Sequence, residues 1–189
     1  MKNFTVIFIA LIMIINVSVS PSYSQCGKER WSVKTLTDKD TTKIDFQNVK
    51  KSTVQKQCLM KRPTKVKNMP RMKTETNVYE IEAYVVEFKK EADQDYHVVI
   101  SDLETGENMV IEIVDPDCPG IRTTSRYQAL KKVRDWFTDE FNPTQSFKNT
   151  HKKVKLTGVG FFDYLHGQRG MSDNGREIHP VLKMEYSNE

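Results

Sequence analysis

The chain has 189 residues with a formal net charge of +4, and 38% of its residues are hydrophobic. Residues 25–189 suit a single domain and contain no long apolar run, so we expect no transmembrane helix there. None of the three cysteines has C-x-x-C spacing, which argues against a zinc knuckle and against a thioredoxin-type site.

Residues 1–24 have the pattern of a signal peptide. Lys2 precedes an unbroken apolar run over 6–15, and small polar residues follow. This run is too short to cross a bilayer, which takes about 20 apolar residues. We therefore expect the protein to be secreted or periplasmic.

Small serines at positions −3 and −1 place the predicted cleavage site between Ser24 and Gln25. Cys26 raises the alternative of a lipoprotein. The preceding Tyr-Ser-Gln lacks the leucine and the small residue that such a site needs, so we favour soluble export.

Charge is distributed unevenly along the rest of the chain. Residues 28–73 contain 14 basic and four acidic residues, a net charge of +10, whereas residues 74–189 carry −7. The stretch 50–73 holds nine basic residues and no acidic one, and it can contact an anionic surface such as nucleic acid, glycan or lipid. The alternative is a solvated arm that packs on its own acidic domain. We expect residues 25–73 to form an extended basic arm of this second kind.

Within this arm, residues 26–40 are predicted to be extended, with Trp31 and Val33 as apolar anchors. Residues 52–59 suit a short helix. Prolines 63 and 70 bracket a basic linker for which we predict no regular structure.

Three strands are predicted next, over 78–88, 95–103 and 109–114. The first segment alternates apolar and polar residues and becomes apolar on both faces near Val86; polar turns separate the three segments. In the second and third strands, the residues expected to face the core are Tyr96, Val98, Ile100, Met109, Ile111 and Ile113. His97 lies on the opposite face, where we expect it to be half exposed.

A helix is predicted over 125–141. Ser125 and Gln128 suggest a capping box, the apolar stripe consists of Leu130, Val133, Phe137 and Phe141, and Asn142-Pro143 ends the helix. Two further strands follow over 152–162 and 178–186. In the last strand we expect Ile178, Leu182 and Met184 to share the core face.

Three strands, a helix and two strands form the layout of the OB-fold, a five-stranded Greek-key barrel. We therefore predict a mainly β domain over 74–189, a closed OB-fold-like barrel with one helix between its third and fourth strands. Gly158 and Gly160 fit a strongly coiled strand, where side chains would obstruct closure. The alternative is an open α+β sheet with the helix across one face.

The sequence resembles a family of uncharacterised exported bacterial proteins. The most specific motifs are GVGFFD at 158–163, HGQ at 166–168 and EIHPV at 177–181; weaker blocks are ERWSVKT at 29–35, DYHVV at 95–99 and DPDC at 115–118. The resemblance covers most of the exported chain. It implies a single OB-like domain and brings no assigned activity.

The export signal predicts an oxidising compartment, in which two of the three cysteines tend to form a bridge. The residues alone leave all three single pairings open. The resemblance implies that Cys26 and Cys118 belong to the family pattern and that Cys58 is particular to this chain. On that basis we predict a bond between Cys26 and Cys118.

Four residues at the facing ends of the last two strands form the candidate site: Asp163, His166, Glu177 and His179. The first interpretation is a hydrogen-bonded network in which the carboxylates orient the imidazoles and hold the loop. The second is a metal site, with His166, His179 and Asp163 as ligands of Zn²⁺ or a similar divalent ion. The third is metal-free acid–base chemistry. We favour the first interpretation, with no cofactor.

Most catalytic motifs are absent from the sequence, including the P-loop, G-x-G-x-x-G, H-E-x-x-H and a Ser-His-Asp order. The acidic balance of residues 74–189 argues against a nucleic-acid ligand, because phosphate contacts need positive charge. We therefore expect an exported OB-fold-like module that binds an unidentified ligand or protein partner and has no catalytic activity of its own. The alternative is a metal-dependent hydrolase, such as a phosphoesterase.

Overall fold

The computed structural model describes residues 26–187, so the predicted signal peptide and its cleavage site lie outside the described residues. Within 26–187, no helix has both the length and the apolar character needed to cross a membrane. The elements in chain order are α1 (Trp31–Lys34), η1 (Lys39–Lys43), β1 (Val49–Ser52), α2 (Val54–Cys58), η2 (Lys73–Glu75), β2 (Val78–Lys90), β3 (Tyr96–Ser101), β4 (Asn108–Ile113), η3 (Ile121–Thr123), α3 (Tyr127–Phe141), β5 (Lys148–Phe162) and β6 (Arg176–Tyr186).

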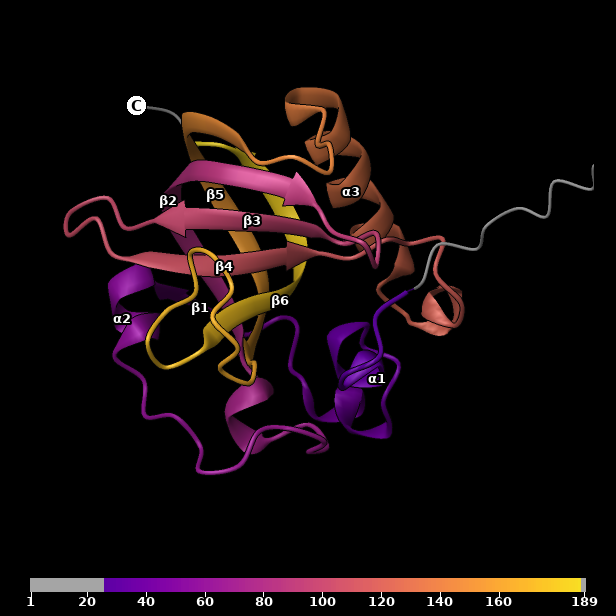
Figure 1. The fold of residues 1–189 in the computed structure, drawn as a ribbon. Helices are drawn as coiled ribbons and strands as arrows, with labels where there is room; N and C mark the ends of the chain where they lie inside the picture. The colour runs from indigo at the N-terminus through magenta and orange to yellow at the C-terminus, as the bar shows by residue number, and fades with distance from the viewer. Residues whose placement is uncertain (1–25, 188–189) are drawn as a thin grey trace, which may run out of the picture.

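Five of the six strands close a ring of hydrogen bonds. β2 pairs with β3 and β3 with β4, both antiparallel; β4 pairs with β6 in parallel, and β6 pairs with β5 antiparallel. The antiparallel pairing of β5 with β2 completes the ring, so the sheet is not open. Figure 1 shows these strands curving around a common interior, with α3 at one side. The predicted order of three strands, a helix and two strands is confirmed.

The structure corrects two predictions about the N-terminal half. The sheet has six strands rather than five, because β1 adds to β2 in parallel, outside the ring. Residues 26–75 are not extended: they contain α1, η1 and η2 as well as β1, whereas α2 confirms the short helix predicted over 52–59. Their apolar side chains explain the difference, since Val33 and Val54 are buried and Val54 belongs to the main core.

The nine basic residues of 50–73 divide into two groups. The seven lysines are exposed. Both arginines bond within the protein: Arg71 pairs with Asp38, and Arg62 donates to the carbonyl oxygens of Asp163 and Asn174. Only the lysines are therefore available to an anionic surface.

The main core fills the interior of the ring. The predicted inward faces of β3 and β4 are confirmed, since Val98, Ile100, Met109, Ile111 and Ile113 are fully buried there. α3 packs against β6 and β4 and adds Val133, Phe137 and Phe141 to the same cluster. His97 contradicts the prediction of a half-exposed position, because it is only 1% exposed.

Two glycines let β6 lie close against β5. A Cβ atom at Gly158 would collide with the Ile178 side chain, and one at Gly160 would collide with Arg176. The pairing register shifts at both glycines. As a consequence Val181, rather than the predicted Leu182, enters the main core beside Ile178.

The start of α3 differs from the prediction. The helix begins at Tyr127, and its N-cap residue, Arg126, makes no side-chain capping bond, so the predicted capping box at Ser125 is wrong. Thr124 instead accepts a bond from the Arg126 amide and ends the preceding turn. At the other end, Asn142 adopts a left-handed conformation before Pro143, as predicted for the end of the helix.

A buried ion pair joins the N-terminal segment to the end of β5. The guanidinium of Arg30 contacts both carboxylate oxygens of Glu75, and both side chains are almost completely buried. Glu75 also accepts the Phe162 amide at 3.0 Å, and Arg30 donates to the Phe162 carbonyl at 3.0 Å. Further bonds from Arg30 reach the carbonyls of Met69 and Pro70. Three segments distant in sequence are thus held by one pair.

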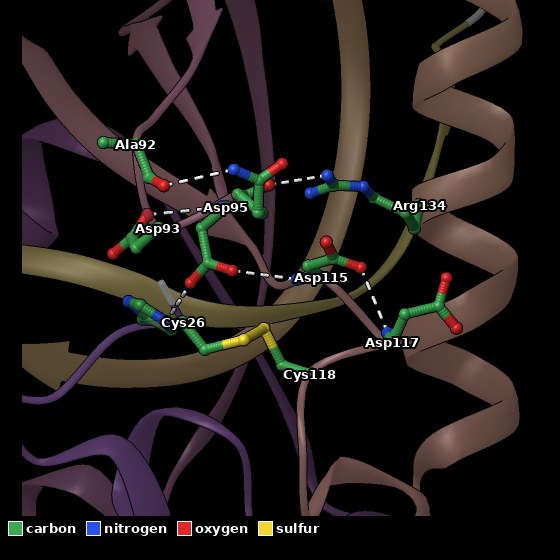
Figure 2. The surroundings of a disulfide bond; sticks show 10 residues. Cys26, Ala92, Asp93, Asp95, Asp115, Asp117, Cys118 and Arg134 are labelled. Carbon is green, nitrogen blue, oxygen red and sulfur yellow. Dashed lines mark hydrogen bonds and ion pairs between the residues drawn. A yellow bond between two sulfur atoms is a disulfide. The ribbon is translucent and has the colours of Figure 1, made fainter. Parts of the chain in front are cut away.

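The predicted disulfide between Cys26 and Cys118 is confirmed, and Cys58 is free. It links the described N-terminus to the loop after β4 across 92 residues of sequence. Figure 2 shows the bond with Asp95, Asp93 and Asp115 around it. The disulfide therefore fixes the start of the N-terminal segment next to the loop between β2 and β3.

We expect Glu75→Gln to lower the free energy of unfolding by about 3–5 kcal/mol, because it leaves the buried Arg30 charge without a counter-charge. The control is Asp117→Asn, which breaks the exposed pair of Arg122 and Asp117 and should change stability by less than about 0.5 kcal/mol. Urea unfolding of the three proteins measures both values. Equal effects of the two substitutions would contradict the importance of the buried pair.

Replacing Cys26 and Cys118 together by serine should lower the free energy of unfolding by roughly 4 kcal/mol, because the bond restricts a long loop in the unfolded chain. Cys58→Ser is the matched control, and we expect it to cost less than about 1 kcal/mol. Both are measured by denaturant unfolding without reductant. A Cys58→Ser variant as unstable as the double variant would show that the wrong cysteines had been identified.

Candidate functional site

A pocket of about 210 Å³ lies where three loops or segments meet. These are the N-terminal segment with α1, the loop between β2 and β3, and the loop between β5 and β6. We call it the interloop pocket. Its lining consists of Gly27, Lys28, Glu29, Trp31, Lys34, Glu91, Asp93, Asp95, Glu112, Asp163, Tyr164, His166, Gln168 and His179.

Asp163 and His166 lie at the β5 side of this pocket. Asp163 directly follows β5 and is 4% exposed, whereas His166 is an exposed loop residue. The Oδ2 atom of Asp163 lies 3.5 Å from His166 Nε2 and 3.7 Å from Lys34 Nζ. Its Oδ1 atom accepts the Tyr164 amide at 2.9 Å. Asp163 is therefore the counter-charge of Lys34.

Glu177 and His179 lie two residues apart on β6 and are both buried. Glu177 Oε1 accepts a bond from the Gln168 side chain at 3.0 Å. Its Oε2 atom lies 3.8 Å from His179 Nδ1, too far for a hydrogen bond. Within residues 26–187, neither that oxygen nor either ring nitrogen of His179 has a hydrogen-bond partner.

The imidazole of His179 is neutral at physiological pH. Burial lowers the pKa of His179 well below its usual value, and the positive charges of Lys34 and Arg30 lower it further. A neutral imidazole has one N–H donor and one acceptor nitrogen. Buried polar atoms without partners are uncommon in folded proteins, and each one calls for an explanation.

The predicted site does not include Lys34, Asp93, Asp95 or Glu112, which the structure places around the same pocket. Asp95 is the most buried of these three carboxyl residues. Its Oδ1 atom accepts the Asp115 amide at 2.8 Å, and its Oδ2 atom lies 4.0 Å from His179 Nε2. Figure 2 shows Asp95 pointing from the turn before β3 toward the disulfide. Burial raises the pKa of Asp95 well above its usual range, and the nearby Asp93 and Glu112 raise it further.

Lys34 is the ammonium group within this set of carboxyls. Burial lowers its pKa, but the negative charges of Asp163, Glu177, Glu112 and Asp95 outweigh that effect and leave the pKa raised. Lys34 is therefore charged. Its position at the C-terminal end of α1 depends on the packing of the N-terminal segment, which explains why no local sequence pattern identified it.

His97 and Glu112 share a proton beneath the pocket. His97 Nε2 donates to the Arg169 carbonyl at 2.8 Å, because a carbonyl can only accept. Nδ1 lies 3.1 Å from Glu112 Oε1, so a proton lies between these two atoms whichever of them holds it. Burial lowers the pKa of His97, but its bonds to Glu112 and to the Arg169 carbonyl leave the pKa raised. This pair neutralises one of the carboxyls that line the pocket.

The loop between β5 and β6 is held by hydrogen bonds from several parts of the chain, one of which is the bond from His97 to the Arg169 carbonyl. Asn174 donates to the carbonyls of Gln57 and Met60, each at 2.9 Å, and Arg62 bonds to the carbonyls of Asp163 and Asn174. Both contacts come from the N-terminal half of the chain. The proposed role of His166 and His179 in holding the loop therefore finds little support in the hydrogen bonds.

The structure shows no preformed metal centre. Among residues 26–187, no group of three or more His, Cys, Asp or Glu side chains is arranged to hold an ion. The arrangement around His179 explains this result, because Glu177 and Asp95 face opposite nitrogens of the ring. One ion cannot bind a ring nitrogen and both carboxylates in that arrangement.

Comparison of the chain with protein-family models, with curated proteins and with solved structures gave no match.

Glu177 should make stability depend on pH. Burial raises its pKa well above the ordinary value of 4.5, and Asp163 adds to this effect. Above pH 4.5 the unfolded chain releases this proton while the folded protein retains it, so stability falls as pH rises toward the raised pKa. Relative to Glu177→Gln, which cannot ionise, the wild type should lose up to about 1.4 kcal/mol per pH unit.

Urea unfolding of both proteins at a series of pH values from 4.5 upward measures this difference. Glu185→Gln is the matched control, because Glu185 is exposed and its pKa is lowered by the bond from Lys183. As pH rises from 4.5, the wild type should not lose free energy of unfolding relative to Glu185→Gln. Parallel curves for wild type and Glu177→Gln would show that Glu177 titrates normally.

Proposed function

We propose that this protein is an exported binding protein with an OB-like barrel, and that its ligand occupies the interloop pocket. The observation that carries the proposal is the place of that pocket in the ring. The five ring strands, β2 to β6, follow the strand and helix order of the OB-fold, with α3 between the third and the fourth. OB-folds bind ligands on the face of their second and third strands, between the first and the last loops.

The interloop pocket has the corresponding position. Asp93 and Asp95 come from the first loop of the ring, and Tyr164 and His166 come from the last. Glu112 comes from β4, the third ring strand. The disulfide and the Arg30–Glu75 pair hold the N-terminal segment as an additional wall. Rigid positioning of the wall suits a binding pocket that is formed before the ligand arrives.

Among the described residues, the free cysteine Cys58 offers no reactive thiol for catalysis. Burial raises the pKa of the Cys58 thiol to about 12, so it is not a thiolate at neutral pH. Cys58 also does not line the interloop pocket. The carboxyl groups that line the pocket disfavour a nucleic-acid ligand, because they would repel its phosphates.

We include export from the cytoplasm in this proposal, because both the family resemblance and the predicted signal peptide indicate it. The disulfide between Cys26 and Cys118 is compatible with an oxidising compartment outside the cytoplasm. A small ligand outside the cytoplasm is therefore the class of partner that we propose.

The test is an NMR titration of the isotope-labelled protein with four probes: benzyl alcohol, benzylamine, benzoate and maltotriose. At least one probe should shift the backbone amides of 91–95 and of 163–168, because these loops line the pocket. The apolar groove of Ala129, Trp136 and Leu182 serves as the internal reference surface. Shifts confined to that groove, or no shifts with any probe, would contradict the proposal.

The absence of catalysis has its own measurement. The protein should not hydrolyse bis(p-nitrophenyl) phosphate above the buffer rate, with or without Zn²⁺. A chelator should leave the Tm unchanged, because an ion bound only by the folded state would stabilise it. Hydrolysis that depends on Zn²⁺ and is lost in His179→Ala would instead favour the metal-dependent hydrolase.

A further inference from the structure

The lining of the interloop pocket carries an excess of acidic groups. Six carboxyls line it against two lysines and two histidines. Glu112 shares a proton with His97, Asp163 pairs with Lys34, and Glu91 pairs with Lys89. In the described part of the chain, Asp93 and Asp95 have no lysine or arginine within ion-pair distance, and Asp95 faces only the neutral ring of His179. Burial is the main reason that the pKa values of Asp93 and Asp95 are raised. A positive charge in this part of the pocket would be stabilised.

His179 gives the second, independent observation. It is 2% exposed, lines the pocket and has two ring nitrogens without a hydrogen-bond partner in the described part of the chain. Its Nε2 atom lies 4.0 Å from Asp95 Oδ2. This separation is too long for a direct hydrogen bond, but one donor nitrogen at about 2.9 Å can reach both atoms at once.

The angle at such a nitrogen would be roughly 90°, which two hydrogens of a tetrahedral ammonium group can serve. Both receiving atoms are acceptors when Asp95 is ionised and the neutral His179 ring carries its hydrogen on Nδ1. A bound ammonium group favours the ionised form of Asp95, because an opposite charge nearby lowers the pKa of a carboxyl and counteracts the effect of burial. The hydrogen on Nδ1 then points toward Glu177, whose Oε2 atom lies 3.8 Å away. A ligand with a single donor hydrogen can satisfy only one of the two acceptors.

Lys34 shows that the pocket already stabilises one ammonium group. Its Nζ atom lies 3.7 Å from Asp163 Oδ2, on the β5 side of the pocket. Asp95 belongs to the other side, at the turn before β3. A second ammonium group near Asp95 would repel Lys34, so the charge of Lys34 limits the affinity of the pocket for a cation.

We propose that the interloop pocket binds its ligand through a protonated primary amine, which donates to Asp95 Oδ2 and to His179 Nε2. This inference rests on the proposed function and names the chemical class of the ligand. The amine can belong to a small molecule or to the end of a larger one. Trp31 and Tyr164 line the same pocket and offer aromatic surface to the carbon part of the ligand.

The test uses matched probes on the purified protein with its disulfide intact. Benzylamine, benzyl alcohol and benzyltrimethylammonium share one aromatic group, and they differ in charge and in N–H donors. Followed by NMR titration, benzylamine should bind at least about tenfold more tightly than the other two, because only it combines charge with several donors. Its shifts should centre on Asp95 and His179.

Two substitutions change the affinity in opposite directions. Asp95→Asn keeps the acceptor for the Asp115 amide but removes the charge, and it should weaken benzylamine binding about tenfold. Lys34→Met removes the competing ammonium group and should strengthen binding several-fold. Misfolding cannot produce such a gain. Asp117→Asn, an exposed carboxyl-to-amide change near the same loop, should leave the affinity unchanged.

Several results would overturn the inference. Equal binding of benzyl alcohol would show that charge is not recognised, although the pocket would remain a binding site. Equal binding of benzyltrimethylammonium would exclude the shared bonds to Asp95 and His179. Binding of Zn²⁺ or Ca²⁺ to these residues, with no binding of benzylamine, would assign the charge to a metal ion. If benzylamine did not bind but another of the four probes of the first titration did, the proposed amine ligand would be wrong and the proposed binding function would stand.

Discussion

The ion pair between Arg30 and Glu75 is the interaction on which the arrangement of the pocket depends. It holds the N-terminal segment, the chain before β2 and the end of β5 at one point inside the protein. Both charges are buried, and five further hydrogen bonds to main-chain groups compensate them. A pair satisfied in this way can orient segments that have too little apolar surface to orient themselves. Lys34 and Trp31 reach the pocket only because Arg30 precedes them at this fixed point.

The second constraint is electrostatic. Carboxyls from two loops, from β4 and from the N-terminal segment converge at one end of the ring, where burial removes water from some of them. Structural needs are met elsewhere: Arg62 and Asn174 hold the long loop, and the disulfide holds the N-terminus. Within residues 26–187, Glu177 Oε2 and both ring nitrogens of His179 remain without a hydrogen-bond partner. Perturbed ionisable groups in a concave site are typical of functional sites, so this end of the ring is the candidate binding site.

The order of elements in the ring was predictable because each one depends on local patterns. The apolar runs of β3 and β4, the apolar stripe of α3 and the turns between the strands need no information from distant residues. The two glycines of β5 marked a close approach, although the register shift that brings Val181 into the core was not visible. Of the short elements before β2, the helix over 52–59 was predicted, whereas α1, η1, β1 and η2 were not. Their conformation depends on contacts with the ring, and their own apolar pattern is weak.

By itself, the sequence determined the order of the ring elements and the presence of two histidine–carboxylate pairs near one another. Only the tertiary structure decided which of these groups are buried, and it added Lys34, Asp95 and Glu112 to them. The physical reason is that burial and charge are properties of surroundings assembled from distant segments. Three of the four predicted residues, Asp163, His166 and His179, line the pocket, and the rest of its lining comes from segments that folding brings beside them.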